Sequence, residues 1–201
     1  ESAEVIKPFL AGRDVKRYAP LVADKFLILF EKGISNQKGA GHRSKWAWVE
    51  SEYPAVAAYL RPFKKEAEKR YDKGDYWWEL RACDYYEGFE GPKIIFPDIA
   101  ERPQFTIDSE GGFYNANTCY NIFISDAFLL GILNSNLINF YYRSIAAVYR
   151  GGYLRFFSQY VEMLPIPSSD PADAARHDRM VSLVEAMLDL NRKLAGARTG
   201  Q

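Results

Sequence analysis

Cysteine and histidine are scarce in this sequence. Cys83 and Cys119 are the two cysteines among 201 residues, no CxxC pair occurs, and the two histidines, His42 and His177, stand far from both. Structural zinc sites and secreted disulfide scaffolds need several such residues at short spacing. We therefore expect neither kind of site, and we interpret both cysteines as reduced, buried thiols of a cytoplasmic protein.

Long apolar runs and an overall charge are also missing. No apolar run approaches the ~18 residues of a membrane span, and we expect neither a signal peptide nor a membrane partner. The 26 Lys and Arg balance the 26 Asp and Glu, so the formal net charge is zero. The chain starts at Glu1 rather than at a methionine, and we interpret it as a fragment of a longer polypeptide.

Motifs for catalysis are absent too. The sequence has no GxSxG, P-loop or GxGxxG pattern, and no Asn- or Asp-Pro-Pro-Tyr tetrapeptide, the mark of adenine-N6 methyl transfer. Asp98 belongs to the stretch "PDIAER", but no acid-x-base pair follows to complete a Mg²⁺-dependent nuclease site, so we expect a strand-ending turn. These absences predict a chain with no catalytic residue, no metal site and no cofactor of its own.

Charge is present but unevenly distributed. Between Lys7 and Lys45, nine Lys and Arg stand against three acids, a local balance of +6. From Ala82 to the end, ten bases stand against fourteen acids, a balance of −4. A domain polarised in this way has a basic side that attracts a polyanion. The alternative is a solvated loop whose charges only keep the protein soluble, and charge alone does not separate the two.

Short apolar runs between turn residues predict a mixed α+β fold with short, mostly antiparallel strands and flanking helices. Strands are expected within residues 25–31, 76–81, 92–98, 104–108 and 118–124. Gly111 and Gly112 separate the last two of these runs and predict a hairpin there. Trp77 and Trp78 alternate on the second run, so one should face inward and the other outward, where Arg81 could stack on it.

Helical periodicity predicts helices near residues 54–72 and 126–148. Pro62 should kink the first helix, and the Asn-Ser-Asn stretch at 134–136 should break the second. A third helix is expected from Pro171 to about Ala195, capped by Asp170 and ended by Gly196. Heptad-like spacing predicts that this helix packs on another helix, in this chain or in a partner, through Val181, Val184, Leu188, Asn191 and Ala195. We expect residues 1–167 to form one domain and residues 168–201 its C-terminal helix and tail.

Two segments carry side chains suited to nucleic-acid recognition. In "RGGYLRF", two glycines between Arg150 and Tyr153 let the backbone approach a phosphate or base edge, and Arg150 can bind guanine. In "YNANTCYN", Asn115 and Asn117 carry amides that can pair with adenine. Both segments have an alternative interpretation as tight turns packed on the core.

Several motifs together resemble a known family. They occur in the order "GRDVKRY", "YPAVAAYLRPFKKEAEKRYDKGDYWWELRACDYYEGFEGPKIIFPDIAERPQFTID", "NTCYNIFI", "LLGILNSNLINFYY", "RGGYLRF" and "QYVEMLPIP". From about Ile6 to Pro167 the chain resembles the TaqI-like C-terminal specificity domain. That family is the target-recognition domain of type II and IIG restriction–modification enzymes and N6-adenine DNA methyltransferases. The last helix resembles the spacer helix of such specificity subunits.

The resemblance implies a sequence-specific module for double-stranded DNA without catalysis of its own. It implies a separate adenine-N6 methyltransferase domain in the same polypeptide, which would use S-adenosylmethionine, and a possible nuclease that would use Mg²⁺. Phosphate contacts are expected from Lys7, Arg13, Lys16, Arg17, Lys38, Arg43 and Lys45. Base or stacking contacts are expected from His42, Trp78, Arg81, Asn115, Asn117, Arg150 and Tyr153. The alternative is a structural domain that docks partners through its aromatic face and last helix.

Overall fold

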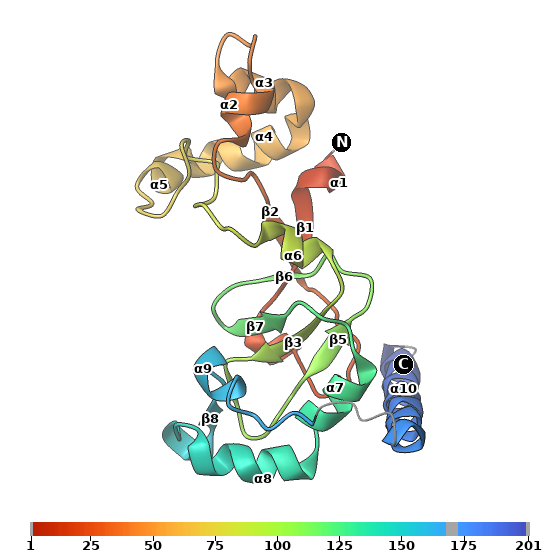
Figure 1. Ribbon diagram of the computed structural model, residues 1–201. Helices are drawn as coiled ribbons and strands as arrows, with labels where there is room; N and C mark the ends of the chain where they lie inside the picture. Colours follow the sequence, from red (N-terminus) through yellow and green to blue (C-terminus); the bar gives the residue numbers. More distant parts are fainter. Residues whose placement is uncertain (1, 168–172, 200–201) are drawn as a thin grey trace. The chain divides into compact units, whose positions relative to one another are not determined.

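The chain folds into two compact units. The computed structural model describes residues 2–167 and 173–199 (Figure 1). Unit 1 comprises Glu1–Pro8 and Lys25–Tyr86, and unit 2 comprises Phe9–Asp24 and Glu87–Gln201. The strand β1 (Ile6–Leu10) runs from one unit into the other, pairing with β2 (Lys25–Ile28) and with β6 (Tyr114–Asn115). Each unit is therefore assembled from two separate pieces of the sequence.

Unit 1 is mainly helical. Its helices are α1 (Ser2–Val5), α2 (Ile34–Lys38), α3 (Lys45–Glu52), α4 (Pro54–Leu60), the 3-10 turn η2 (Arg61–Phe63) and α5 (Lys64–Glu68). Ser44 caps α3 by accepting a hydrogen bond from the Ala47 amide at 3.0 Å, and Pro54 suits the first turn of α4. The kink expected at Pro62 is confirmed, because the α-helix gives way to η2 there. The helix α3 was not expected from the sequence, and the expected helix ends at Glu68 rather than near residue 72.

Aromatic rings form the core of unit 1. Phe30 lies edge-on to Trp48 and Tyr53, with ring centroids 6.0 and 5.5 Å apart. Trp77 and Trp78 are both buried, with exposed fractions of 9% and 7%, in a turn. The strand expected at 76–81, with one outward tryptophan, is therefore wrong. Two adjacent residues can both face the core because a turn does not impose the alternation of a strand.

Unit 2 is built around the strand β3 (Lys93–Pro97), which is buried along its whole length. The strands β5 (Thr106–Asp108) and β7 (Cys119–Ile122) flank it, both antiparallel. The short strands β4 (Ile99–Ala100) and β8 (Leu154–Arg155) form a second antiparallel pair, while β1 and β6 pair in parallel. The hairpin expected at Gly111 and Gly112 is wrong, because β5 and β7 lie on opposite sides of β3.

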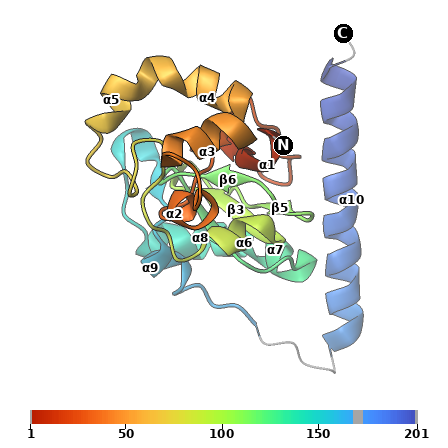
Figure 2. The same cartoon turned by 90° about the horizontal axis from the view of Figure 1, so that it is seen from above.

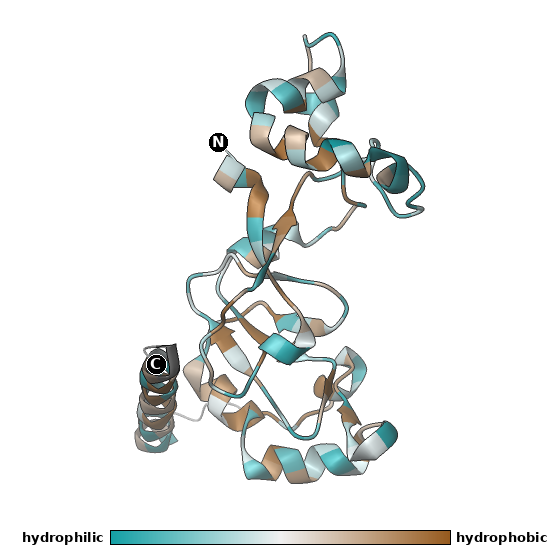
Figure 3. Ribbon diagram, turned by 180° about the vertical axis from the view of Figure 1, so that it is seen from behind, coloured by the Kyte–Doolittle hydropathy of each residue, from teal (hydrophilic) through white to brown (hydrophobic). Residues whose placement is uncertain are grey.

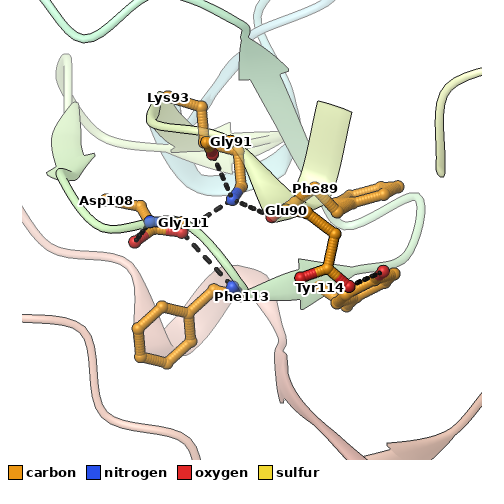
Figure 4. A network of polar contacts seen from close by, with 8 residues as sticks. All are labelled: Phe89, Glu90, Gly91, Lys93, Asp108, Gly111, Phe113 and Tyr114. Atoms are coloured by element: carbon orange, nitrogen blue, oxygen red, sulfur yellow. Dashed lines mark hydrogen bonds and ion pairs between the residues drawn. The ribbon is translucent and has the colours of Figure 1, made fainter. Parts of the chain in front are cut away.

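A buried polar network holds the Gly111–Gly112 segment (Figure 4). Lys93 Nζ donates to Asp108 Oδ2 at 2.6 Å and to the carbonyls of Phe89 and Gly91 at 2.6 and 3.2 Å. The Asp108 carboxylate also accepts hydrogen bonds from the amides of Gly111 and Phe113, at 2.9 and 3.3 Å. The two glycines, with φ of +83° and +92°, thus belong to a loop that folds back around this carboxylate.

Unit 2 also contains several helices. They are α6 (Tyr86–Glu90, which begins at the last residue of unit 1), α7 (Ala127–Leu133), α8 (Asn136–Ile145), α9 (Ser158–Val161) and α10 (Ala174–Thr199), with 3-10 turns η1 (Gly12–Asp14) and η3 (Arg150–Gly152). Asp126 caps α7 and Ser135 caps α8, which confirms the break expected at 134–136. Tyr142 of α8 stacks on Phe156, with centroids 4.4 Å apart, inside the main hydrophobic cluster.

The C-terminal helix α10 packs on α7, as Figure 2 shows. A Cβ added to Gly131 would lie 2.9 Å from Val184 Cγ2 and 3.0 Å from Met180 Sδ, so the glycine permits the close approach. The expected packing of this helix on another helix is confirmed. Its expected end at Gly196 is wrong, since α10 continues to Thr199, and the cap expected at Asp170 and Pro171 lies outside the described residues.

A second apolar stripe on α10 is exposed. It consists of Leu183, Met187, Leu190 and Leu194, with exposed fractions of 57%, 42%, 59% and 51%. These residues recur at heptad spacing, and Figure 3 shows brown, hydrophobic bands among teal ones along the helix that ends at the C mark. The helix thus has one apolar side against α7 and a second, exposed apolar stripe beside it.

The fold class expected from the sequence is confirmed. The chain is mixed α+β, with short, mostly antiparallel strands, flanking helices and a C-terminal helix. Within the ranges 2–167 and 173–199, none of the helices has both the length and the apolar content needed to span a membrane.

Candidate nucleic-acid interface

The basic stretch from Lys7 to Lys45 is divided between the two units. Each unit therefore holds part of the predicted set. Unit 1 contains Lys7, Lys38, His42, Arg43, Lys45, Trp78 and Arg81. Unit 2 contains Arg13, Lys16, Arg17, Asn115, Asn117, Arg150 and Tyr153.

In unit 1, the loop between α2 and α3 gathers four predicted residues. Lys38 ends α2, His42 and Arg43 lie in the exposed segment that follows, and Lys45 begins α3. Lys45 Nζ donates to the Gly39 carbonyl at 3.2 Å, which closes the loop, and Lys38 Nζ lies 3.8 Å from a Glu4 carboxylate oxygen. Lys7 is half-buried in β1. The structure thus brings together three cations and a histidine on one short loop.

The buried carboxylate of Glu79 anchors the N-terminus of α2, the helix that leads into this basic loop. Glu79 has no solvent exposure and accepts hydrogen bonds from the amides of Gly33, Ser35 and Asp75 at 3.1, 3.1 and 2.8 Å. Charge-assisted hydrogen bonds of this kind are stronger than neutral ones. Glu79 is not among the residues predicted from the sequence, where its one signal is an acid between tryptophans and a leucine.

Trp78 and Arg81 have different surroundings from those expected. Trp78 Nε1 donates to the Ser35 hydroxyl at 2.9 Å, and its ring stacks on Tyr76 at 4.8 Å between centroids. Because it is buried, Trp78 offers no open face for a base in this structure. The Arg81 side chain is exposed, while its carbonyl accepts a hydrogen bond from Tyr86 at 3.0 Å.

Near η1 in unit 2, three predicted cations differ in their environment. The exposed Arg13 lies 3.6 Å from Asp14 and 3.8 Å from Asp24, which partly offset its charge. Lys16 is also exposed. Arg17 Nη2, in contrast, donates to the Asn134 carbonyl at 2.7 Å, so this side chain also supports the fold.

Of the two predicted asparagines, Asn115 ends β6 and Asn117 lies in the turn between β6 and β7. Asn115 Nδ2 donates to the carbonyls of Ala116 and Cys119, at 3.2 and 3.1 Å, so its amide supports the turn. Asn117 is exposed. The turn is the feature that the alternative interpretation of this segment proposed.

Arg150 and Tyr153 lie together at an exposed turn before β8. The segment 149–153, here called the tip, contains η3 and the left-handed Gly151 and Gly152, with φ of +81° and +82°. Arg150 is exposed, and Tyr153 is 39% exposed. A hydrogen bond to Glu101 raises the pKa of the Tyr153 phenol.

Behind the tip lies an ion pair that the sequence analysis missed. Arg155 Nε and Nη2 donate to the two carboxylate oxygens of Asp98 at 3.0 and 2.9 Å. Asp98 is the acid of the "PDIAER" stretch, and it pairs with a guanidinium rather than with further acids. Among the described residues there is no group of three His, Cys, Asp or Glu that could hold a metal ion.

Comparison with known proteins identifies the family of the chain. The sequence is similar to the Type II methyltransferase M.BanIII of Aneurinibacillus aneurinilyticus, with 24% identity over 180 residues. The alignment covers 83% of this chain but 30% of that methyltransferase, so the chain spans about a third of its relative's length. The profile of the TaqI-like C-terminal specificity domain matches residues 7–166. The chain belongs to the family of TaqI-like C-terminal specificity domains.

Proposed function

We propose that this chain recognises a specific sequence in double-stranded DNA and positions a separate adenine-N6 methyltransferase domain of the same polypeptide on it. The observation that carries the proposal is the specificity-domain match over residues 7–166. Exposed cations in both units support it, since phosphate contacts by Lys and Arg supply much of the affinity for DNA.

Methyl transfer, on this proposal, takes place outside the 201 residues. The sequence has no Asn- or Asp-Pro-Pro-Tyr tetrapeptide, and its relative M.BanIII, named a Type II methyltransferase, is about three times longer than the part that aligns. S-adenosylmethionine would be bound by that separate domain, and Mg²⁺ by any accompanying nuclease. The described residues of this chain would contribute DNA contacts. The complete polypeptide would be a type II restriction–modification enzyme of the cytoplasm.

Salt dependence of binding tests the phosphate contacts. Each Lys or Arg that binds a phosphate adds about 0.9 to the slope of log K against log salt. Replacing Lys38 and Arg43 by Gln in unit 1, or Arg13 and Lys16 by Gln in unit 2, should flatten this slope by up to about 1.8 and weaken all sequences alike. Arg17 is left unchanged because its guanidinium donates to the Asn134 carbonyl.

Matched controls have the same charge change at exposed sites outside the predicted set. Lys64→Gln with Lys65→Gln in α5 serves unit 1, and Arg192→Gln with Lys193→Gln in α10 serves unit 2. These pairs should leave the slope unchanged. If the two variants in the predicted set leave the slope of log K against log salt as unchanged as the two controls do, the predicted cations do not contact phosphates.

The exposed stripe of α10 favours the alternative function, a docking domain. Exposed apolar patches on proteins mark interaction sites more often than chance. If the complete polypeptide binds no duplex at low salt, and Leu190→Glu with Leu194→Glu instead disrupts the contact between this chain and the methyltransferase domain, docking is the function of this chain.

A further inference from the structure

The tip is a closed turn that presents three large side chains. The Tyr149 amide donates to the Tyr153 carbonyl at 2.6 Å, and the Gly152 amide donates to the Tyr149 carbonyl at 3.2 Å. Tyr149 is 50% exposed and Tyr153 39% exposed, with Arg150 exposed between them. A guanidinium flanked by two aromatic rings is a common composition of binding surfaces.

The glycines leave the backbone of this turn accessible. A Cβ at Gly152 would meet nothing within 4 Å, so glycine is required there by its φ of +82° and not by crowding. An L-residue would be strained in this conformation and would add a side chain beside Arg150. A flat ligand can therefore approach the turn closely at the position where the Arg150 side chain leaves it.

The tip is fastened to the body of unit 2 on its inner side. The bidentate pair between Arg155 and Asp98 is joined by a hydrogen bond from the Phe156 amide to the Asp98 carbonyl at 2.7 Å. The Arg155 guanidinium also lies 4.2 Å from the Phe157 ring centroid and 5.8 Å from that of Tyr149. Arg155 thus connects Asp98, next to β4, with the first aromatic residue of the tip.

The two arginines near the turn have different roles. Arg155 is neutralised by Asp98, and their side chains are 26% and 13% exposed. The Arg150 side chain makes no hydrogen bond or ion pair with any residue in the described ranges, so its five donors face solvent. The Arg155 guanidinium thus holds the turn in place, whereas the Arg150 guanidinium is available to a ligand.

We infer that Arg150 reads a guanine in the major groove and that Asp98 and Arg155 are positioning residues for it. The inference rests on the proposed function. Arginine binds the O6 and N7 of guanine in a bidentate manner, and this is the commonest specific contact in the major groove. Bidentate recognition needs a fixed direction of approach, which the Asp98–Arg155 pair supplies by restraining Tyr149 and β8.

Selection from a randomised library of DNA duplexes tests this inference in the complete polypeptide. The wild-type protein should select a site with at least one required G·C pair. Arg150→Ala should lose preference at one G·C pair by about 5- to 160-fold and keep the other positions of the site. Arg102→Ala, which removes an exposed arginine from the same unit, should keep the whole site.

The positioning role makes a prediction opposite to that of simple electrostatics. Asp98→Asn removes one negative charge, so affinity for unrelated duplexes should stay the same or rise. Preference at the pair read by Arg150 should nevertheless fall, and Arg155→Lys should lose it at the same pair while conserving charge. Glu110→Gln, an exposed acid with the same charge change, should leave selection unaltered.

The outcomes are distinguishable. A wild-type protein that binds no duplex overturns the proposed function and this inference together. Specific binding that Asp98→Asn and Arg155→Lys leave unchanged overturns the positioning role alone. Equal weakening of all sequences by Arg150→Ala would show a phosphate contact and overturn base reading. Circular dichroism checks that each variant is folded, and Arg150→Ala changes an exposed side chain that supports no other residue in the described ranges.

Discussion

The ammonium of Lys93 and the carboxylate of Asp108 form a buried ion pair, 2.6 Å apart, with side-chain exposures of 0% and 4%. Every donor of the Lys93 ammonium has an acceptor, since Nζ also bonds the carbonyls of Phe89 and Gly91. Asp108 in turn fixes the loop that starts with Gly111. Removing one partner would leave the other charged and buried without its counter-ion, which is costly even where the pair itself contributes little.

Lys93→Met should therefore destabilise the protein by about 3–5 kcal/mol, because the Asp108 carboxylate loses its counter-ion. Urea unfolding, followed by circular dichroism, measures the free energy of unfolding. Lys193→Met serves as the control, since it breaks the exposed pair between Lys193 and Asp189 at 2.7 Å and should cost about 1 kcal/mol or less. If the two variants lose the same free energy of unfolding, burial does not explain the importance of the Lys93–Asp108 pair.

Glu79→Gln should destabilise unit 1 by about 2–4 kcal/mol. The amide side chain has one acceptor oxygen, whereas the carboxylate accepts bonds from three backbone amides, and bonds to a charged group contribute about 1.5–3 kcal/mol each without adding fully. Tryptophan fluorescence reports the change, since Trp78 is adjacent. Glu50→Gln removes a half-buried carboxylate near the surface of the same unit and should have the smaller effect.

The two thiols should differ in reactivity. Burial raises the pKa of the Cys119 thiol to about 12, and its side chain is almost inaccessible. Because the thiolate is the reactive form, Cys119 should resist iodoacetamide at pH 8 in the folded protein, whereas the half-buried Cys83 should react first. Mass spectrometry of peptides after timed labelling locates the modification. Rapid labelling of Cys119 without denaturant would contradict its burial.

Alkaline stability should depend on Tyr86. Burial, with smaller contributions from Cys83 and Glu31, raises the pKa of its phenol from 10.0 to about 12. Between these values the folded protein holds a proton that the unfolded chain has lost, so the stability contributed by this group is present below pH 10 and declines as the pH rises toward 12. The protonated phenol also donates to the Arg81 carbonyl.

Tyr86→Phe should consequently reduce the alkaline loss of stability, measured as urea midpoints between pH 9 and 11. Tyr71→Phe is the control, because the Tyr71 ring is fully exposed and should have a similar environment in the folded and unfolded chain. If Tyr86→Phe loses stability between pH 9 and 11 as steeply as the wild type, other groups cause the alkaline loss of stability.

Local signals predicted much of the fold. Asp126 and Ser135 start α7 and α8 because their side chains accept hydrogen bonds from free backbone amides at the helix N-termini. Pro62 interrupts the helix that begins at Pro54, because proline has no backbone amide hydrogen to continue it. The failures arose where distant contacts outweighed local pattern. The Trp77–Trp78 run resembles a strand, but its surroundings in unit 1 bury both rings in a turn. Gly111–Gly112 resembles a hairpin turn, but the segment forms a loop around Asp108, which pairs with the distant Lys93.

The candidate site was predictable in part. Composition pointed to Arg150 and to the loop around His42 because exposed cations and glycines are visible in a sequence. The side chains that hold these elements, Glu79 for the loop and Asp98 with Arg155 for the tip, could not be assigned this way. Their partners lie 46 and 57 positions away in the chain, and such pairings appear only after folding.

The division of the sequence between the units constrains how a new specificity could be inherited. Unit 1 is largely one continuous insertion, Lys25–Tyr86, whereas Phe9–Asp24 supplies unit 2 with the buried Leu10, Val15 and Tyr18. A single recombination crossover near Glu87 would therefore combine Phe9–Asp24 of one parent with the rest of unit 2 from the other parent, so the core of unit 2 would be mixed. Two crossovers, at the edges of residues 25–86, would exchange the basic loop as a cassette and leave the tip and its supporting sheet with their original lineage.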